Sequence, residues 1–467
     1  MNSASIQRVW ALTALFFIWA AALIAGLVSI ALRTPVTTYY WPKPVEAAPI
    51  LAPRGAIYAA DGTPLAISLQ NGDRVYPMGE LAGQVIGYVK GQRSKDGHIN
   101  TRHEENAGQA GAEMAFEGQL AGGADVYLTL DPALQTFAEN ALWPAVSQSG
   151  AEWGTLIAME SSSGKLLAVA NAPKFNPDSP RGSPAKDARL TNYAFERLVE
   201  PGSTMKALTA AILLQQGAAR MQDVVEAPMT RRVADRNIRD VVYHPGKLSL
   251  EGVLAYSSNV GMSTFVERID AKTLYEYHRK LHLFDEDLLP GFKVWRPLHK
   301  KLQDIGAVEL ANLSFGQGIS VTPLHLAAAF NALANDGVWL EPTLVEPLRE
   351  RSGQRIFSPE VARQLRRVLA KHNAPRARLK GYSLAGKTGT AQISTGKGYR
   401  SSHTYAALYA GFIPATKPRL TVLVVLYNPK TSIFGSKVAA PIFRNFAEHA
   451  LAYWGTPPHS SGLARSE

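Results

Sequence analysis

The chain has 467 residues, of which 46% are hydrophobic and 19% are charged, so it can form more than one globular core. It contains no cysteine, which excludes disulfide bonds, thiol catalysis and cysteine-ligated metal sites. Its 49 Lys and Arg residues against 38 Asp and Glu residues give a formal net charge of +11. That sign suits nucleic acid, anionic lipid and acidic wall polymer alike, so charge alone does not choose a partner.

The N-terminal segment is expected to anchor the chain in a membrane. The stretch from Val9 to Leu32 carries no charge and is bracketed by two arginines. As a helix it would extend about 36 Å, which is enough to cross a hydrocarbon core of ~30 Å. The alternative is a cleaved signal peptide, but the apolar core of such a peptide is normally only ~7–15 residues long. We therefore expect a cytoplasmic stub and transmembrane anchor over residues 1–33, followed by a Pro- and Ala-rich juxtamembrane linker over 34–53.

Residues 54–150 are expected to form a small β-rich pedestal module. Short strands alternate with turn signals such as Asp61-Gly62 up to about residue 123. A strand is then predicted at Val126–Leu130. A helix is predicted at Pro132–Leu142, with Asp131 as its N-cap and proline at the first helical position.

Residues 151–455 are expected to form the main domain, followed by a C-terminal tail over 456–467. The first and last segments of the main domain have the pattern of strands, and the segments between them have the pattern of helices. Strands are expected at Gly154–Glu160, Lys165–Ala170, Ser383–Ala385, Tyr405–Phe412 and Leu420–Leu426, and helices at Ser203–Gly217, Leu250–Ile269, Pro323–Asn335, Pro359–Lys371 and Ala440–Leu451. This order indicates an α+β domain and not an alternating parallel fold. A basic run from Arg363 to Lys380, which includes Arg366, is interpreted as a solvated face because no nucleic-acid motif accompanies it.

The motif Ser-x-x-Lys occurs four times, opening at Ser162, Ser183, Ser203 and Ser394. Only Ser203 opens an apolar helical run, and residues three apart share a helix face, so Lys206 can reach the Ser203 hydroxyl. A helix N-terminus also favours an alkoxide and disfavours an ammonium group. The alternative is a serine N-cap beside a lysine that extends to solvent, and this stretch alone does not decide between the two.

Two further motifs favour the catalytic interpretation. Ser257-Ser258-Asn259 is the only Ser-x-Asn sequence in the chain and lies in a predicted helical stretch. Lys387-Thr388-Gly389 is the only Lys-Thr-Gly sequence, and the predicted strand Thr390–Ile393 follows it. Each alone is ordinary, since Ser-Asn pairs cap helices and Lys-Thr-Gly can form a turn. All three motifs in this order are typical of penicillin-binding proteins and class A β-lactamases.

On these residues the chain resembles a class B penicillin-binding protein, and among these the division-type transpeptidases. The glutamate that precedes Pro201-Gly202 is more similar to the division branch than to the elongation branch. Two departures from the family pattern stand in the N-terminal module: Ala59 replaces a usual aspartate, and the long head insertion is missing between Leu69 and Arg74. Several further segments resemble family blocks: Arg54-Gly55, Gly108–Glu113, Glu200–Lys206, Ser257–Gly261, Phe315–Ile319 with Thr322-Pro323, Asn335–Gly337 and Gly386–Ala391.

The resemblance implies an antiparallel sheet flanked by helices and an acyl transfer at its edge. Ser203 would attack the D-Ala-D-Ala end of a peptidoglycan stem, and an amine of a neighbouring stem would resolve the acyl-enzyme. Lys206 would be the base, which requires its pKa to fall from ~10.4 to about 7–8. Ser257 would relay a proton to the leaving D-Ala, and Asn259 would hold the peptide and Lys206 in place.

The Lys-Thr-Gly segment is implied to bind the substrate carboxylate. Lys387 would stay charged and attract this group, which the hydroxyls of Thr388 and Thr390 would grip. Gly389 would let the strand approach the peptide closely. The backbone N–H groups of Ser203 and Thr390 would form the oxyanion hole.

No cofactor or metal is expected. His278 and His282 lie four residues apart without the glutamate of a zinc-protease helix and are expected to be solvated. The partners implied are donor and acceptor stem peptides, β-lactams, the bilayer, and, for septal wall synthesis, a membrane peptidoglycan glycosyltransferase and other division proteins; nucleic acid is not among them. The catalytic domain would be periplasmic, on a single-pass protein of the bacterial inner membrane.

Two other functions remain open from the sequence. The same site would act as a D,D-carboxypeptidase or a β-lactamase if water resolved the acyl-enzyme. A catalytically silent scaffold or β-lactam sensor is a third possibility, although such a protein is expected to show a broken motif and all three motifs are intact.

Overall fold

The computed structural model describes residues 53–458 except for 103, 105, 181–187, 347–352 and 394–403, together with residues 10, 13, 14, 16 and 19–25. The chain divides into two units, Met1–Leu51 and Ala52–Glu467. The described residues of the first unit are helical. A helix long and apolar enough to span a membrane is not found in the described part of the chain. More than half of the expected anchor, Val9 to Leu32, lies outside that part, as does most of the expected linker.

The pedestal contains a sheet of short strands in the order β4-β5-β3-β2-β1-β6. Neighbouring strands are antiparallel except for β1 and β6, which are parallel. The turn from β2 to β3 is tight, because the Asn71 side chain accepts a hydrogen bond from the backbone N–H of Asp73 at 3.0 Å. The elements are β1 Ile57–Tyr58, β2 Pro64–Ser68, β3 Asp73–Val75, β4 Gln92–Arg93, β5 Ile99–Asn100, β6 Val126–Tyr127, α2 Gly83–Ile86, α3 Gly111–Ala115 and α4 Glu117–Ala121.

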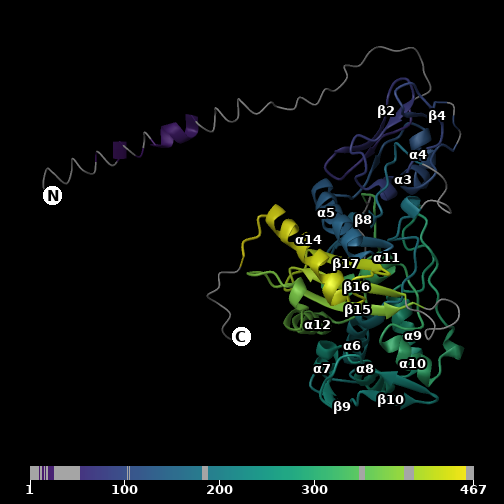
Figure 1. The fold of residues 1–467 in the computed structure, drawn as a ribbon, viewed down its shortest axis with the longest axis vertical. Helices are drawn as coiled ribbons and strands as arrows, with labels where there is room; N and C mark the ends of the chain where they lie inside the picture. The colour runs from purple at the N-terminus through teal and green to yellow at the C-terminus, as the bar shows by residue number, and fades with distance from the viewer. Residues whose placement is uncertain are drawn as a thin grey trace. The chain divides into compact units, whose positions relative to one another are not determined.

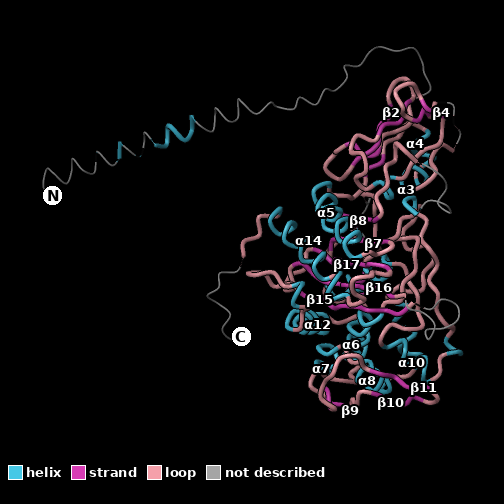
Figure 2. Tube along the Cα trace, viewed as in Figure 1, coloured by secondary structure: helices cyan, strands magenta, loops and turns pink. Residues whose placement is uncertain are grey.

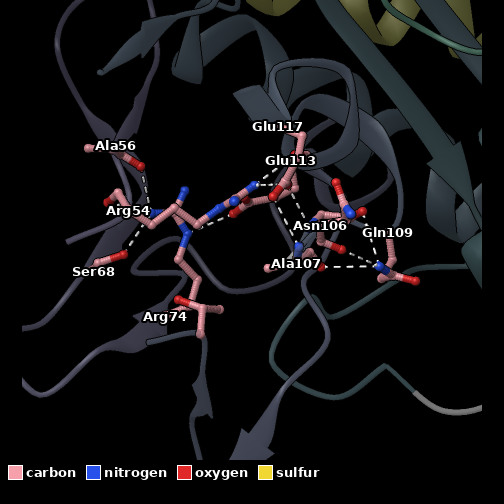
Figure 3. A network of polar contacts seen from close by, with 12 residues as sticks. Arg54, Ala56, Ser68, Arg74, Asn106, Ala107, Gln109, Glu113 and Glu117 are labelled. Carbon is pink, nitrogen blue, oxygen red and sulfur yellow. Dashed lines mark hydrogen bonds and ion pairs between the residues drawn. The ribbon is translucent and has the colours of Figure 1, made fainter. Parts of the chain in front are cut away.

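A buried ion cluster joins the first described residues of the pedestal to α3 and α4 (Figure 3). Arg54 contacts Glu113 at 2.8 Å and Glu117 at 2.7 Å, and Arg74 contacts the other oxygen of Glu113 at 2.7 Å. The Tyr76 hydroxyl donates to the same carboxylate at 3.2 Å. Glu113 and Arg74 are fully buried. Glu113 therefore bridges the two guanidinium groups, and together Glu113 and Glu117 balance their charges; loss of Glu113 would leave the buried Arg74 without its carboxylate partner.

The main sheet has the order β15-β16-β17-β7-β8 and is antiparallel throughout. Helices α5 and α14 cover one face, and α11 covers the other (Figure 1). Two apolar clusters, one on each face, make up the core. The elements are β7 Trp153–Glu160, β8 Leu166–Ala172, β15 Ala385–Gln392, β16 Tyr405–Ile413, β17 Leu420–Tyr427, α5 Pro132–Ser149, α11 Pro323–Ala334 and α14 Ala440–Tyr453. The observed arrangement confirms the predicted α+β class.

Helices α6 to α10 pack mainly on one another and on small hairpins, whereas α12 and α13 contact β15 of the main sheet directly. Figure 2 shows the short strands β9 to β11 beside α8, away from the pedestal strands β2 and β4. The helices are α6 Met205–Gln215, α7 Leu250–Tyr256, α8 Asn259–Phe265, α9 Ala271–Lys280, α10 Ala307–Ser314, α12 Pro359–Lys371 and α13 Gly435–Val438. The strands are β9 Val224–Glu226, β10 Thr230–Val233, β11 Arg236–Arg239, β12 Lys247–Ser249, β13 Val338–Trp339 and β14 Gln354–Arg355. Short 3-10 turns are η1 Ala188–Leu190, η2 Gly202–Thr204, η3 Val266–Arg268, η4 Leu302–Asp304 and η5 Pro375–Ala377.

The single helix predicted over Leu250–Ile269 is wrong. The helix breaks at Ser257, which has a φ of 61°, and α8 starts afresh after Ser258. The Ser258 hydroxyl accepts a hydrogen bond from the N–H of Gly261 at 2.8 Å and so caps the new helix. Apolar residues on both sides of the break sustain one helical pattern in the sequence, which conceals it.

The bounds of other elements also differ from those predicted. The predicted strands Ser383–Ala385 and Thr390–Ile393 each overlap one strand, β15, which also contains Lys387–Gly389, so Lys-Thr-Gly is not a turn. Helix α5 runs past the predicted end at Leu142 and packs on β7 and β8 of the main sheet, ending at Gly150 with a φ of 63°. The domain boundary at residue 150 stays a prediction.

One member of the basic run is not solvated. The side chain of Arg366 is 6% exposed and donates to the carbonyl oxygens of Leu333 and Ala334 at 2.7 and 3.2 Å. It also contacts Asp336 at 2.7 Å. Arg366 therefore satisfies carbonyl groups at the end of α11, where cations are favourable, and this contradicts the expectation of a fully solvated face.

Candidate active site

The three sequence motifs meet around the Ser203 hydroxyl. Lys206 Nζ donates to Ser203 Oγ at 2.7 Å and to the carbonyl oxygen of Ser257 at 2.7 Å, and it lies 3.3 Å from Ser257 Oγ. Lys387 Nζ donates to Ser257 Oγ at 2.8 Å. Residues separated by more than 180 positions thus form one continuous hydrogen-bond chain from the nucleophile to the edge strand.

The turn η2 presents Ser203 at the start of α6. Residues Met205–Leu213 of α6 are all buried, so this helix is fixed on every side. The backbone N–H of Gly202 donates to the carbonyl oxygen of Gly316 at 3.0 Å. A Cβ atom on Gly316, whose φ is +81°, would lie 2.3 Å from the oxygen of Gly202. The Phe315–Ile319 segment therefore holds the nucleophile turn through a contact that only glycine permits.

Burial sets the charges of the two lysines. Lys206 is fully buried, and its pKa is well below the ordinary value because burial disfavours the ammonium form; Lys387 lowers it further, while Asp240 opposes the shift. Burial also lowers the pKa of Lys387, to about 8. At neutral pH the site therefore favours a neutral Lys206 beside a charged Lys387, which is the charge state that a base and a carboxylate receptor need.

Strand β15 borders the site with its motif residues. Thr388 and Thr390 are half-buried, and Gly389 is buried. A Cβ atom on Gly389 would lie 3.0 Å from the oxygen of Pro201 and from Cγ2 of Thr204. The space beside Gly389 is thus filled by the nucleophile turn, and the glycine brings turn and strand together.

The two backbone segments expected to form the oxyanion hole are neighbours. A Cβ atom on Gly202, the residue before Ser203, would lie 3.1 Å from the carbonyl oxygen of Thr390. Thr390 Oγ1 accepts a hydrogen bond from the N–H of Gly435 at 3.4 Å. The start of α13 therefore steadies the strand at the position of Thr390.

A buried carboxylate that the motifs do not include organises the Ser-x-Asn segment. Asp240 Oδ2 accepts from Ser258 Oγ at 2.5 Å, and Oδ1 accepts from the backbone N–H groups of Asn259 and, at 3.2 Å, Val260. His244 Nε2 lies 2.8 Å from Asp240 Oδ2. The Asp240 side chain is 3% exposed and the His244 side chain is fully buried.

Asn259 is held at the site through its backbone N–H, which donates to Asp240, whereas its side chain contacts a different partner. Its amide Nδ2 donates to the carbonyl oxygen of Arg239 at 3.2 Å, and no hydrogen bond joins it to Lys206 among the described residues. Sequence reasoning missed Asp240 and His244 because no motif spacing links β11 to the Ser-x-Asn segment. The available signal was weak: a lone Asp and His in a loop between two short strands.

The alternatives noted in the sequence do not assemble a site among the described residues. Ser162 lies in the turn between β7 and β8, whereas Ser183 and Ser394 lie outside the described residues. His278 is fully buried, which contradicts the expected solvated state, and burial lowers its pKa to about 4. His282 pairs with Asp285 at 2.6 Å. A group of residues that could hold a metal ion is not found in the part of the chain described.

Comparisons with known proteins find one family over most of the chain. A family model described as the penicillin binding protein transpeptidase domain matches residues 154–448. The probable peptidoglycan D,D-transpeptidase PbpC of Pseudomonas aeruginosa is 31% identical over 423 residues, covering 82% of this chain and 71% of PbpC. The probable peptidoglycan D,D-transpeptidase PenA of Neisseria gonorrhoeae is 29% identical over 420 residues, covering 82% of this chain and 69% of PenA.

Solved structures are similar over most of the chain as well. The crystal structure of penicillin-binding protein 3 from Mycobacterium tuberculosis in complex with ampicillin aligns with a TM-score of 0.79 and 27% identity. The alignment covers 88% of this chain and 97% of that structure. The similarity therefore extends across both the pedestal and the domain that carries Ser203.

Proposed function

The chain belongs to the penicillin-binding protein transpeptidase family, and we propose that it cross-links peptidoglycan through an acyl-enzyme formed on Ser203. It is a class B, division-type member and a serine-type peptidoglycan D,D-transpeptidase of cell-wall synthesis. The observation that carries the proposed site is the 2.7 Å hydrogen bond between Ser203 Oγ and the buried amine of Lys206.

In the proposed acylation step, neutral Lys206 takes the proton of the Ser203 hydroxyl. The oxygen attacks the carbonyl of the penultimate D-Ala, and the backbone N–H groups of Ser203 and Thr390 stabilise the oxyanion. A well-aimed donor of this kind contributes about 3–4 kcal/mol. Lys387 attracts the terminal carboxylate, and the hydroxyls of Thr388 and Thr390 hold it beside β15.

Release of D-Ala requires a proton on its amine. Ser257 Oγ lies within hydrogen-bond range of both lysines, at 3.3 Å from Lys206 Nζ and 2.8 Å from Lys387 Nζ. It can therefore pass the proton that Lys206 took from Ser203 to the departing amine. An amine of a second stem then attacks the ester, forms the new amide and returns the proton to Ser203.

A hydrolase with the same nucleophile is the second candidate function. A lactamase needs a base that activates water against the acyl-enzyme, whereas Lys206 and Ser257 account for proton transfer to and from an amine. The relatives named as probable peptidoglycan D,D-transpeptidases favour the transferase. A β-lactam that acylates Ser203 is expected to remain bound as a covalent inhibitor.

We also place the protein at the cytoplasmic membrane, anchored by the uncharged segment from Val9 to Leu32, with its catalytic domain outside the cytoplasm. From the resemblance of its motifs to division-type transpeptidases, we propose septal wall synthesis beside a membrane glycosyltransferase that supplies glycan strands. The roles proposed for Ser203 and the residues around it do not depend on this location.

The test combines a donor pentapeptide that ends in D-Ala-D-Ala with an acceptor stem that carries a free side-chain amine. The full chain should release D-Ala and form a cross-linked dimer, and Ser203→Ala should form neither product. Release of D-Ala with only a shortened donor would favour the carboxypeptidase. Absence of both products in the wild-type chain would favour a silent scaffold.

A further inference from the structure

An exposed apolar crest lies on the loop between β11 and β12. Its residues are Val241, Val242 and Tyr243, whose relative exposures are 78%, 53% and 83%. Single exposed apolar side chains are common on soluble proteins and need no explanation. Three in succession, with a large aromatic side chain among them, form a surface of the kind that marks a binding site.

The crest is held in place by its buried neighbours. Asp240 precedes it and His244 follows it, and their side chains contact each other at 2.8 Å. The carboxylate of Asp240 also accepts the hydrogen bonds from Ser258 and Asn259. One buried group thus fixes both the crest and the Ser-x-Asn segment of the active site.

Two exposed residues, Tyr256 and Arg239, lie where the crest loop meets the Ser-x-Asn segment. Tyr256, the residue before Ser257, is 42% exposed, and its ring centroid lies 6.0 Å from that of His244. Arg239, on the other flank of the crest, is exposed, and its carbonyl oxygen accepts from the Asn259 amide. The loop that carries the crest is therefore bonded to the segment that carries Ser257, through Asp240 and the carbonyl oxygen of Arg239.

The chemistry of the second half-reaction requires a place for the acceptor on that side. In the proposed mechanism the donor lies beside β15, and the departing amine leaves next to Ser257 Oγ. Attack by the acceptor amine is this step in reverse, so the acceptor amine occupies the same position. The remainder of the acceptor must then extend from Ser257 away from β15, where the donor lies.

We propose that the crest binds the acceptor stem peptide, in an inference that rests on the proposed function. Val241 and Tyr243 would pack against the aliphatic parts of the stem that carries the amine, and Arg239 would face its carboxylate groups. The amine nitrogen then forms the amide bond with the acyl carbon as the ester bond to Ser203 Oγ breaks, and its proton passes to that oxygen. The crest positions the acceptor and takes no part in acylation.

The test measures how the acyl-enzyme partitions between transfer and hydrolysis. The full chain in detergent is acylated with a benzoyl-D-alanyl thioester in the presence of either a stem tripeptide with a free side-chain amine or D-alanine alone. Tyr243→Ala should lower transfer to the stem relative to hydrolysis by about tenfold, the scale of a central aromatic at an interface. Val241→Ser should act in the same direction. Acylation and transfer to D-alanine, which has no side chain to reach the crest, should stay at the wild-type level.

Matched controls are Tyr453→Ala on α14 and Val224→Ser on β9, whose side chains are 51% and 57% exposed. Both should partition like the wild-type chain. The inference is overturned if the crest variants also transfer to the stem at the wild-type ratio, as they would if the crest served another protein. It is equally overturned if the crest variants lose transfer to D-alanine as well as transfer to the stem. The loop would then be needed to position the catalytic residues. A wild-type chain that the thioester does not acylate contradicts the proposed function itself.

Discussion

Lys206 and Lys387 converge on one oxygen atom. Their Nζ atoms lie 3.3 and 2.8 Å from Oγ of Ser257. Two ammonium groups this close in a buried site disfavour each other, and burial disfavours both. The pKa of Lys206 is lowered by burial first and by Lys387 second, whereas that of Lys387 is lowered by burial, to about 8. The arrangement therefore assigns the neutral base to Lys206 and the cation to Lys387.

The first prediction concerns the rate at which penicillin acylates the protein at alkaline pH. Lys387 carries its charge below its pKa of about 8 and loses it above, so acylation should decline as the pH rises past this value. Arginine stays protonated throughout this range. Lys387→Arg should therefore move the decline to higher pH, even if the larger side chain lowers the rate overall. The acylation rate from pH 6 to 10 checks this, and an unchanged midpoint in the variant would exclude Lys387 as the titrating group.

The second prediction concerns Asp240 as a positioning residue. Asp240→Asn keeps the size of the side chain but weakens charge-assisted hydrogen bonds to Ser258 and to the backbone of Asn259. Acylation by penicillin should slow by about tenfold while the final yield stays at one adduct per chain. Asp235→Asn is the matched control, because its side chain is 74% exposed. An incomplete yield at a wild-type rate would indicate partial unfolding and contradict a positioning role.

The third prediction concerns the pedestal. Glu113→Gln removes the carboxylate shared by Arg54 and Arg74, and breaking a buried ion pair on one side typically costs 3–5 kcal/mol. The melting temperature should fall clearly. Glu226→Gln breaks an exposed pair with Lys247, 71% exposed on each side, and should cost no more than about 1 kcal/mol. Equal melting temperatures for the two variants would show that the buried cluster is not needed for stability.

The fourth prediction concerns the stability of the protein against pH. Glu139 is 4% exposed, and burial raises its pKa from 4.5 to about 7. The protonated Glu139 side chain therefore contributes fully to the free energy of unfolding below pH 4.5. This contribution is lost as the pH rises through about 7. Glu139→Gln stays neutral and can still accept from the backbone N–H of Ala82 and from Gln135, which bond to Oε1 at 2.7 Å.

The variant should therefore be more stable than the wild-type chain at pH 8, by up to about 3 kcal/mol, and equal to it near pH 4. Chemical unfolding at both values measures the difference. A variant that is less stable at pH 8 would mean that the carboxylate is ionised and satisfied in its site.

Motif spacing was sufficient to predict the contact between Ser203 and Lys206, because residues three apart share a helix face. The late strands of the main sheet were predicted for a related reason: Tyr405–Ile413 and Leu420–Tyr427 are nearly continuous apolar runs, typical of strands buried on both faces. Both features depend on residues that lie close together in the sequence, so a sequence pattern is sufficient to predict them.

The rest depends on residues that only the fold brings together. The break at Ser257 exists because Ser258 caps α8 and Asp240 accepts from its first N–H groups, although Asp240 is 17 or more residues upstream. The burial of Arg366 follows from the position of α11 under α12, which charge patterning along one helix cannot reveal. The complete burial of His278 on α9 likewise has no signal in the spacing of the two histidines.

The central claim is that Ser203 is the nucleophile and that neutral Lys206 activates it. The most direct test is labelling of the full chain with a fluorescent penicillin, followed by location of the adduct by peptide mass. We predict one long-lived adduct on Ser203, none in Ser203→Ala, and acylation at least about 100-fold slower in Lys206→Met, the range for loss of a general base. Labelling that persists in Ser203→Ala, or an adduct on another residue such as Ser162, would contradict the account.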